Sequence, residues 1–537
     1  MDDARTVADA IVYSEGVIQF VGGEHQARLW LRRAGLDYAE HDARGGCILP
    51  GFIDAHLHPM LMAVYEHSID LKNCASVLDV ECLIVEKASQ TPEHQWILGL
   101  QLDPLAMPAG QLPDRYLLDK ICPDNPLVLF GRDGHSVTIN TIAMRLASLE
   151  NGVEEIEGGT IERNTAGEPS GIFRENAVAL VMAHFVPPSQ EQIFVSAQRA
   201  FSKLAAEGVT SIGAILQTDK EGPGGASSEH EFLAMEVLAD TSPFAIYSIL
   251  IGERVPSADG FSASTLNAAD QGNKINAFKI FSDGTLGSCT ACMHQGFFDH
   301  PEKLGYLTLP TDEIYRRMVD AHLQGWQICI HAIGDKAVET CVTLYERLLD
   351  RYPRQDHRHR IEHASVVNRE CLEKISQLRL VLCCQPLFVR SEQQWLPQRL
   401  GPERTLMAYP FKSFMTAGIV VAGSSDAPIE SVSVLAAIEC CVTRDGFTVD
   451  QCISVDQAIA MYTRNAAYAQ FEEHEKGSLE VGKRADMVLL DKNPHQVEVT
   501  RIGALKVIKT ICAGRESYCI NEAESGSENT HPSELVE

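Results

Sequence analysis

The sequence predicts a (β/α)8 TIM barrel of the α/β class, with a small β-domain made from both chain ends and an insertion after barrel strand 1. Eight short apolar runs recur along the chain, and helical spacing of apolar residues follows most of them. Near-continuous apolar strands are typical of a parallel sheet that is covered on both faces. Polar side chains stand at the ends of several runs, where barrels of this kind carry their chemistry.

The eight predicted strands alternate with predicted helices. Residues 191–208 and 311–325, for example, carry apolar side chains at helical spacing and end at a glycine. The strands are expected at residues 46–58, 209–216, 244–250, 276–284, 326–335, 358–364, 380–386 and 418–428. We therefore expect eight parallel strands whose carboxyl ends meet on one face of the barrel.

The first strand ends in the run GFIDAHLHPM at residues 51–60. Successive side chains of a strand alternate between faces, so Asp54, His56 and His58 share one face. Two imidazoles about 7 Å apart along one face can bind one metal ion. Two hydrogen-bonded histidines at a strand end would give the same pattern, so this motif alone leaves both interpretations open.

Residues outside the repeating units predict further parts. Both chain ends contain short strands with glycine turns, and we expect them to pair with each other. The stretch after the first strand is too long for a connecting loop and has strand-like runs of its own. The expected parts are a composite β-sandwich-like domain at 1–50 and 474–520, the barrel at 51–70 and 186–473, a subdomain at 71–185 over the barrel mouth, and a disordered tail at 521–537.

Composition and charge exclude several classes of partner. Acidic residues number 73 against 45 basic ones, which gives a formal net charge of −28 and disfavours nucleic acid and anionic membranes as partners. The chain has neither a secretion-signal pattern at its start nor an apolar run of about 18 residues.

The 16 cysteines are scattered through apolar stretches, which favours buried thiols in a reducing, cytoplasmic compartment. Cys289, Cys292 and His294 form a CxxC pair with a nearby histidine, but a structural zinc site would need a second pair.

Polar residues at the strand ends form a candidate site. Taken singly, a lysine could lie at an edge, a histidine could be hydrogen-bonded in the core, and an aspartate could cap a helix. Six such residues at the carboxyl ends of strands of one barrel are not explained by packing, and a buried lysine is costly unless it is neutralised or paired. The six are His56, His58, Lys279, His331, His363 and Asp426.

Ten sequence runs show a resemblance to a known family. They occur in the expected order along nearly the whole chain: LPGFIDAHLHP, DGHSVTIN, GEPSGIF, AFKIFSDGTLGS, IHAIGDKAV, RIEHA, QP at residues 385–386, AGSSDAPIES, YTRNAAYA and KGSLEVGKRADMVLLD. The chain resembles the amidohydrolase superfamily, in particular its branch called amidohydrolase 3 or YtcJ-like, which includes N-substituted formamide deformylase. This resemblance implies a barrel of the metal-dependent hydrolase type.

The resemblance also implies a ligand set. His56 and His58 would hold one metal together with Asp426, and His331 and His363 would hold a second. Lys279 would match a lysine that many relatives carboxylate with CO₂ to bridge the two metals. Such a donor set suits Zn²⁺ first, with iron, manganese or nickel as alternatives, and one or two ions are expected.

A metal-activated hydroxide would then hydrolyse the amide-type C–N bond of a small molecule, with Asp426 as the general base. His135 would reach the substrate carbonyl or hold a loop, and these two interpretations stay open. Asp283, Cys289 and Gln385 are candidates for substrate binding.

Two departures from the family pattern put substrate preference in doubt. Gly213 and Ala214 stand where relatives carry a histidine and an aspartate, and Cys289 replaces an arginine. The same metal site could open a cyclic amide or a lactone, or carry out a deamination, because pocket shape sets these choices. A barrel that has lost catalysis and acts as a binding or regulatory scaffold is a further alternative. A homodimer is possible, since many barrels of this kind dimerise.

Overall fold

The computed structural model describes residues 7–35, 37–103, 107, 112–131, 136–149, 159–175, 177–186, 188–219, 230–256, 264–268 and 271–520. His135 and the predicted tail at 521–537 lie outside the described residues. The chain divides into two compact units, one of Met1–Met60 with Phe201–Glu537 and one of Leu61–Ala200. The first unit contains the predicted barrel and both chain ends, and the second contains most of the predicted insertion.

Eight parallel strands form the sheet of the first unit, which confirms the predicted fold class. They are β4 (Phe52–Leu57), β11 (Val209–Gln217), β12 (Ala245–Ile251), β13 (Lys274–Phe281), β14 (Gln327–Ala332), β15 (Arg360–His363), β16 (Val381–Cys384) and β17 (Val421–Gly423). Neighbours in the chain are neighbours in the sheet, from β4 at one edge to β17 at the other. The sheet curls until these two edges meet, so that it nearly closes into a barrel.

The seam between β17 and β4 is held just beyond the ends of the strands. The amide of Asp426 donates to the carbonyl of His56 at 2.9 Å, and the amide of His58 donates to the carbonyl of Ala427 at 2.8 Å. These hydrogen bonds fix predicted ligands from opposite sides of the seam against each other.

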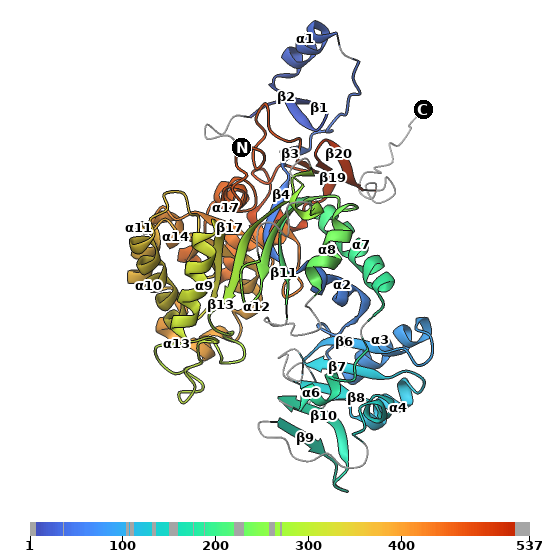
Figure 1. The fold of residues 1–537 in the computed structure, drawn as a ribbon. Coiled ribbons are helices and arrows are strands. Elements are labelled where there is room, and N and C mark those ends of the chain that lie inside the picture. Colours follow the sequence, from blue (N-terminus) through green and yellow to red (C-terminus); the bar gives the residue numbers. More distant parts are fainter. Residues whose placement is uncertain are drawn as a thin grey trace, which may run out of the picture. The chain divides into compact units, whose positions relative to one another are not determined.

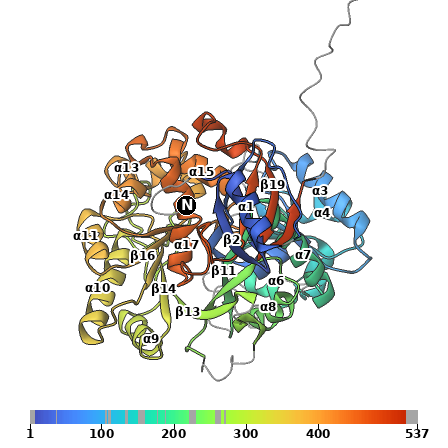
Figure 2. The ribbon, with the colours of Figure 1, turned by 90° about the horizontal axis from the view of Figure 1, so that it is seen from above.

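Helices surround the strands, and α9 (Thr311–Leu323), α10 (Asp335–Arg351) and α11 (Arg369–Gln377) lie on their outer side (Figure 2). α10 shows why they pack there, since Val338, Cys341, Tyr345 and Leu348 repeat at helical spacing and are all buried. Further helices of this unit are α8 (Glu231–Ala239), α12 (Pro386–Glu392), α13 (Leu396–Thr405), α14 (Phe411–Thr416), α15 (Val434–Thr443), α16 (Val455–Met461) and α17 (Arg464–Ala469).

The chain ends pair with each other. β3 (Cys47–Pro50) lies antiparallel to β18 (Met487–Leu490), and the sheet continues through β19 (Val507–Cys512) to β20 (Arg515–Cys519). The hairpin of β1 (Ala10–Ser14) and β2 (Val17–Gly22) precedes α1 (Glu24–Ala34). Ile18 joins the hairpin to the last part of the chain, because its amide donates to the carbonyl of Lys483 and its side chain packs on Ala485 and Met487.

The floor of the barrel, at the start of its strands, is polar. Gln327 donates through Nε2 to the carbonyl of Ala469, at the end of α17. Lys476 and Glu472 form a buried ion pair at 2.5 Å, and the ammonium also donates to Ser211 Oγ on β11 at 2.6 Å. These contacts fix the segment that follows α17 beneath the strands.

The second unit has a six-stranded mixed sheet of its own (Figure 1). Its order is β5 (Ile69–Asp70), β6 (Ile97–Leu102), β7 (Leu127–Gly131), β8 (Ser136–Ile139), β10 (Pro169–Glu175) and β9 (Gly159–Arg163). Its helices include α3 (Val77–Gln90), α4 (Arg115–Ile121), α5 (Thr141–Leu146) and α6 (Val178–Met182), and the two unit boundaries fall within α2 (Pro59–His67) and α7 (Gln190–Ala206). Across the described residues of both units, each helix is too short or too polar to cross a membrane.

Candidate metal centre

The six residues predicted as metal ligands come together at the carboxyl ends of the barrel strands. The imidazole centroids of His56 and His363 are 5.3 Å apart, and those of His331 and His363 are 4.5 Å apart. Lys279 Nζ lies 3.5 Å from His56 Nε2. Asp426 Oδ1 lies 3.3 Å from His56 Nε2 and 3.2 Å from Nε2 of His58, and among the six only His58 is partly exposed.

Two of these side chains depend on unusual backbone at a strand end. His363 and Asp426 have φ angles of 70° and 57°, in the left-handed region that most side chains avoid. Such conformations persist where the surrounding structure holds them, and they cluster at functional sites. Asp54 holds the backbone before Asp426 in place, since its buried carboxylate accepts hydrogen bonds from the amides of Ser425 and His56.

Three of the four histidines are each held through one ring nitrogen. His56 Nδ1 contacts the carboxylate of Glu362, and His331 Nε2 donates to the carbonyl of Gly284 at 3.1 Å. His363 Nδ1 donates to Gln385 Oε1 at 2.8 Å. Each contact needs a proton on the nitrogen concerned, so the other nitrogen of each ring keeps its lone pair. This arrangement, with an acceptor behind each imidazole, is the one that metal-binding histidines adopt.

The electrostatics keep the same groups in their ligating forms. Burial lowers the pKa of His363 to about 3 and that of His331 well below its usual range, so both rings are neutral at neutral pH. Burial alone would raise the pKa of Asp426, but the side chains of His56 and His58 hold it well below its usual range. Neutral imidazoles and an ionised carboxylate are what a divalent transition metal requires.

The position of Asp426 Oδ1 tests whether a metal fits. Within the described chain this buried oxygen accepts no hydrogen bond, although two imidazole nitrogens lie near it. The ligand atoms of His56, His58 and Asp426 all lie within 4.8 Å of one another. An anionic oxygen beside the lone pair of His56 is repulsive unless a cation lies between them, which is a proton in the metal-free protein and a metal ion when one is bound. The donor set of imidazole nitrogen and carboxylate oxygen therefore fits a divalent transition metal.

Lys279 is buried among these groups. Burial lowers the pKa of its amine, while Glu362 and Asp426 act in the opposite direction. The ammonium nitrogen lies 5.1 Å from the ring centroid of Phe281, two residues along the strand. A lysine with a lowered pKa is neutral part of the time, and the neutral amine is the form that reacts with CO₂.

Glu362 and Arg360 are the main residues that sequence reasoning missed. Both are fully buried, and the guanidinium of Arg360 binds the Glu362 carboxylate through Nε and Nη2, each at 2.7 Å. Glu362 precedes the predicted ligand His363 directly, so strict alternation along a strand would point it away from the site. The charges of Arg360 and Glu362 inside the buried strand of the run RHRIEHA were the available signal.

The residues predicted to bind substrate have protein partners. Asp283 Oδ2 accepts from the amides of Cys292 and Gly334, and Oδ1 accepts from that of Ile333, so the carboxylate ties the loop after β13 to that after β14. Burial raises the pKa of Asp283 to about 7. Gln385 donates from Nε2 to Ser424 Oγ at 2.8 Å while it accepts from His363.

Two further positions bear on the departures from the family pattern. Cys289 is buried, and its Sγ lies 2.7 Å from Nη1 of Arg399 on α13. A guanidinium from α13 therefore reaches the position where the family pattern has an arginine. A Cβ on Gly213 would lie 2.1 Å from the carbonyl oxygen of Ala55 and 3.2 Å from Gln470 Nε2. The strands approach too closely there for any side chain.

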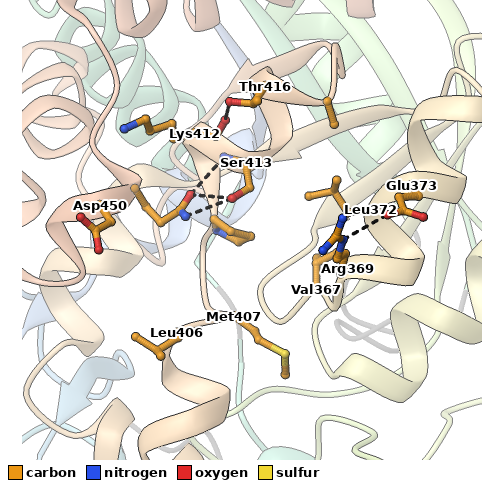
Figure 3. A pocket seen from close by; sticks show the side chains of 13 residues that line it. Val367, Arg369, Leu372, Glu373, Leu406, Met407, Lys412, Ser413, Thr416 and Asp450 are labelled. Atoms are coloured by element: carbon orange, nitrogen blue, oxygen red, sulfur yellow. Dashed lines mark hydrogen bonds and ion pairs between the residues drawn. The ribbon is translucent and has the colours of Figure 1, made fainter.

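A pocket on the outer surface of the barrel lies apart from these residues (Figure 3). It has a volume of about 580 Å³, and its lining includes Leu372 of α11, Leu406, and Lys412 and Ser413 of α14. Arg369 and Glu373 form an ion pair along one wall. None of the predicted ligands or substrate-binding residues in the described chain lines this pocket.

Comparison with known proteins agrees with this centre. The chain is 27% identical over 519 residues to YtcJ of Bacillus subtilis (strain 168), named as an amidohydrolase, covering 95% of this chain and 96% of that protein. It is 26% identical over 541 residues to N-substituted formamide deformylase of Arthrobacter pascens, covering 96% of each. The structure of an uncharacterized metal-dependent hydrolase from Pyrococcus furiosus superposes with a TM-score of 0.71 at 25% identity, covering 90% of this chain and 95% of that one.

A family model agrees with these pairwise matches. The model described as the amidohydrolase family matches residues 39–518, which include every predicted ligand and all eight barrel strands. The chain therefore belongs to the amidohydrolase family.

Proposed function

We propose that the protein is a metal-dependent amidohydrolase that hydrolyses the amide-type C–N bond of a small molecule. His56, His58 and Asp426 would hold one divalent ion, and Lys279, His331 and His363 would complete a second position. The observation that carries this proposal is the group of His56, His58 and Asp426, in which the Nε2 atoms of both imidazoles lie within 3.3 Å of the buried Asp426 Oδ1. Family membership gives independent support.

The chain's own residues supply the proton chemistry. A bound divalent cation lowers the pKa of a coordinated water and polarises a carbonyl oxygen. Asp426 stays ionised and presents Oδ1 to the site, so it can take the proton of the attacking water and pass it to the departing amine nitrogen. The backbone turn at Asp426 fixes this carboxylate in place.

Lys279 is the proposed bridge between the two positions. Its neutral amine would attack the carbon of CO₂, forming an N–C bond and losing one proton, which leaves a carbamate anion. Two nearby cations would stabilise that anion. The burial of this amine and its contact with His56 support the assignment.

Formamides are the first substrates to test, since one relative is named an N-substituted formamide deformylase. Cyclic imides and lactones belong in the same panel, because the same metal site could act on them. Cys289, which lies beside Arg399, and Gly213, which has no side chain, differ from the residues that the family resemblance implies, so substrate preference has to be measured. Zinc is the first metal to supply.

Elemental analysis tests the proposal. The protein is purified with bicarbonate and without chelator, beside Lys279→Ala and the control Lys274→Ala, which changes a partly exposed lysine at the start of the same strand. We expect about two equivalents of transition metal in the wild type and the control, and one or none in Lys279→Ala. One equivalent in all three would place Lys279 outside a single-metal site. Protein that stays free of metal when supplied with zinc would favour the scaffold alternative.

A further inference from the structure

A charged pair lies behind the predicted ligands and takes no part in the proposed proton transfer. Arg360 and Glu362 are both fully buried at the interior of the barrel. The guanidinium binds the Glu362 carboxylate twice and donates from Nη2 to the carbonyl of Ala55 at 3.0 Å. The same carboxylate contacts His56 Nδ1 through Oε2.

These contacts converge on one ligand. Ala55 directly precedes His56 on β4, so Arg360 holds the backbone beside the ligand while Glu362 holds its ring. A carboxylate that accepts the Nδ1 proton fixes the ring orientation and leaves Nε2 as the free nitrogen. His56 Nε2 is the atom that faces Asp426 Oδ1 at 3.3 Å.

Stability alone does not account for this pair. Desolvation of two ions costs several kcal/mol each, and apolar replacements of a buried ion pair are often neutral or stabilising. The other ligands are held differently, since His363 has a neutral amide behind it and His331 has a backbone carbonyl. His331 Nε2 also lies 3.6 Å from Asp283 Oδ1, so among the described histidine ligands a carboxylate in direct contact with Nδ1 is found at His56.

We propose that Arg360 and Glu362 form a positioning unit that sets the orientation and tautomer of His56 and thereby strengthens the metal position of His56, His58 and Asp426. This inference rests on the proposed function. Loss of the unit should weaken that metal position and spare the one formed by His331 and His363.

Three double variants separate this role from general stabilisation. Arg360→Met with Glu362→Leu removes both charges together, so no buried charge is left without its partner. Arg360→Met with Glu362→Gln also removes both charges but keeps an amide oxygen that can accept the Nδ1 proton. Lys476→Met with Glu472→Gln is the matched control, because it removes the buried ion pair of the barrel floor.

The readout is binding of Co²⁺ to the metal-free protein. Each variant is titrated with Co²⁺ in the presence of bicarbonate, the visible absorption of the bound ion is recorded, and dissociation constants come from competition with a chelator. We expect one of two binding steps to weaken about 10- to 100-fold in the Leu variant. The Gln variant should regain most of that affinity and the wild-type spectrum, and the floor variant should bind as the wild type does.

The outcomes are distinguishable. Wild-type affinity and spectrum in the Leu variant would overturn the inference and leave the proposed function intact. A wild-type protein that binds no Co²⁺ would overturn the proposed function and this inference with it. If circular dichroism shows that the Leu variant does not fold, Glu362→Asp replaces it, since it keeps a carboxylate for Arg360 but shortens the reach to His56. The same weakening of one step is expected, and wild-type binding would again overturn the inference.

Discussion

Three neutral histidines at the start of β14 and β15 should make the barrel lose stability in mild acid. His359 Nδ1 accepts from the amide of Ile328 at 3.0 Å, so its proton is on Nε2, which lies 2.8 Å from His322 Nδ1. His322 Nε2 then donates to the carbonyl of Tyr352 at 2.9 Å. Every ring nitrogen of the two is used, and a further proton on either ring would bring two donors together.

His357 extends the network. Its Nδ1 accepts from the amide of His359 at 2.9 Å and its Nε2 donates to the carbonyl of Leu378 at 2.9 Å. Burial lowers the pKa of all three histidines, and the nearby Arg354 guanidinium lowers them further. Asp356 opposes this shift at His357 without reversing it.

The sign and size of this pH effect on the free energy of unfolding follow from proton binding. The unfolded chain takes up these protons as the pH falls through about 6.5, while the folded state does not, so acid favours unfolding. Between about pH 7.5 and 5.5 a histidine that stays neutral throughout costs about 1.4 kcal/mol of unfolding free energy, so the upper limit for the three together is about 4 kcal/mol. Above about pH 7.5 they contribute no pH dependence.

His357→Asn isolates one of the three, because the asparagine Oδ1 can accept from the His359 amide but cannot titrate. Urea unfolding at the two pH values should show a smaller pH-dependent loss in this variant, by up to about 1.4 kcal/mol. His474→Asn, at a side chain that is 90% exposed, should keep the wild-type pH dependence. An unchanged loss in His357→Asn would refute the assignment of a neutral His357.

Three further predictions concern the site and its loops. Gly213→Ala places a Cβ 2.1 Å from the Ala55 carbonyl oxygen, so β4 must shift. We expect the free energy of unfolding in urea to fall by about 1–3 kcal/mol and metal binding to weaken. Unchanged stability would contradict the close approach of the strands. Asp283→Ala leaves three backbone amides without their acceptor and should cost about 3 kcal/mol or more, whereas a role in substrate binding alone would raise KM at constant stability. Asp426→Asn should lower kcat on the best substrate of the panel about 10²- to 10⁴-fold, and an unchanged kcat would contradict the role of Asp426 as general base. Removal of metal by a chelator should abolish turnover until zinc is returned, and turnover without metal would contradict the metal-dependent reaction.

The fold and the convergence of the candidate ligands on one face were predictable for a simple reason. Strand periodicity marks all eight strands, and parallel strands in a barrel bring their carboxyl ends to one face whatever the intervening loops do. Residues separated by hundreds of positions, such as His56 and Asp426, could therefore be brought together from the order of elements alone. Metal occupancy and the catalytic roles stay predictions until they are measured.

The supporting contacts could not be predicted in the same way. Glu362 and His363 are neighbours in sequence, and both reach His56 only because the left-handed backbone at His363 breaks the alternation of the strand. Gln385 was expected near the substrate, but the structure engages its amide with His363 and Ser424. Such contacts depend on rotamers and strand spacing, which hydrophobic periodicity does not encode.

The orientation of the ligands is a property of the closed barrel. Three acceptors hold imidazoles that belong to other strands: Glu362 on β15 holds His56 of β4, the carbonyl of Gly284 after β13 holds His331 of β14, and Gln385 after β16 holds His363 of β15. The second and third contacts join neighbouring strands, but the contact of Glu362 with His56 joins strands far apart in the sheet order and forms only when the sheet curls round. Metal binding should therefore depend on the same closure that completes the fold.

The seam between β17 and β4 is where this coupling should be measurable. His56 and His58 approach the proposed metal from one side of the seam and Asp426 from the other, so a bound ion would join the two edges. Zinc at about 100 times its dissociation constant should stabilise the folded state by about 2.7 kcal/mol. In hydrogen exchange, the amides of His58 and Asp426, which bridge the seam, should gain more protection from zinc than those of β12, in the middle of the sheet. Equal protection at both places would mean that the ion does not bridge the seam, and the pairing of Asp426 with the two histidines as ligands would then fail.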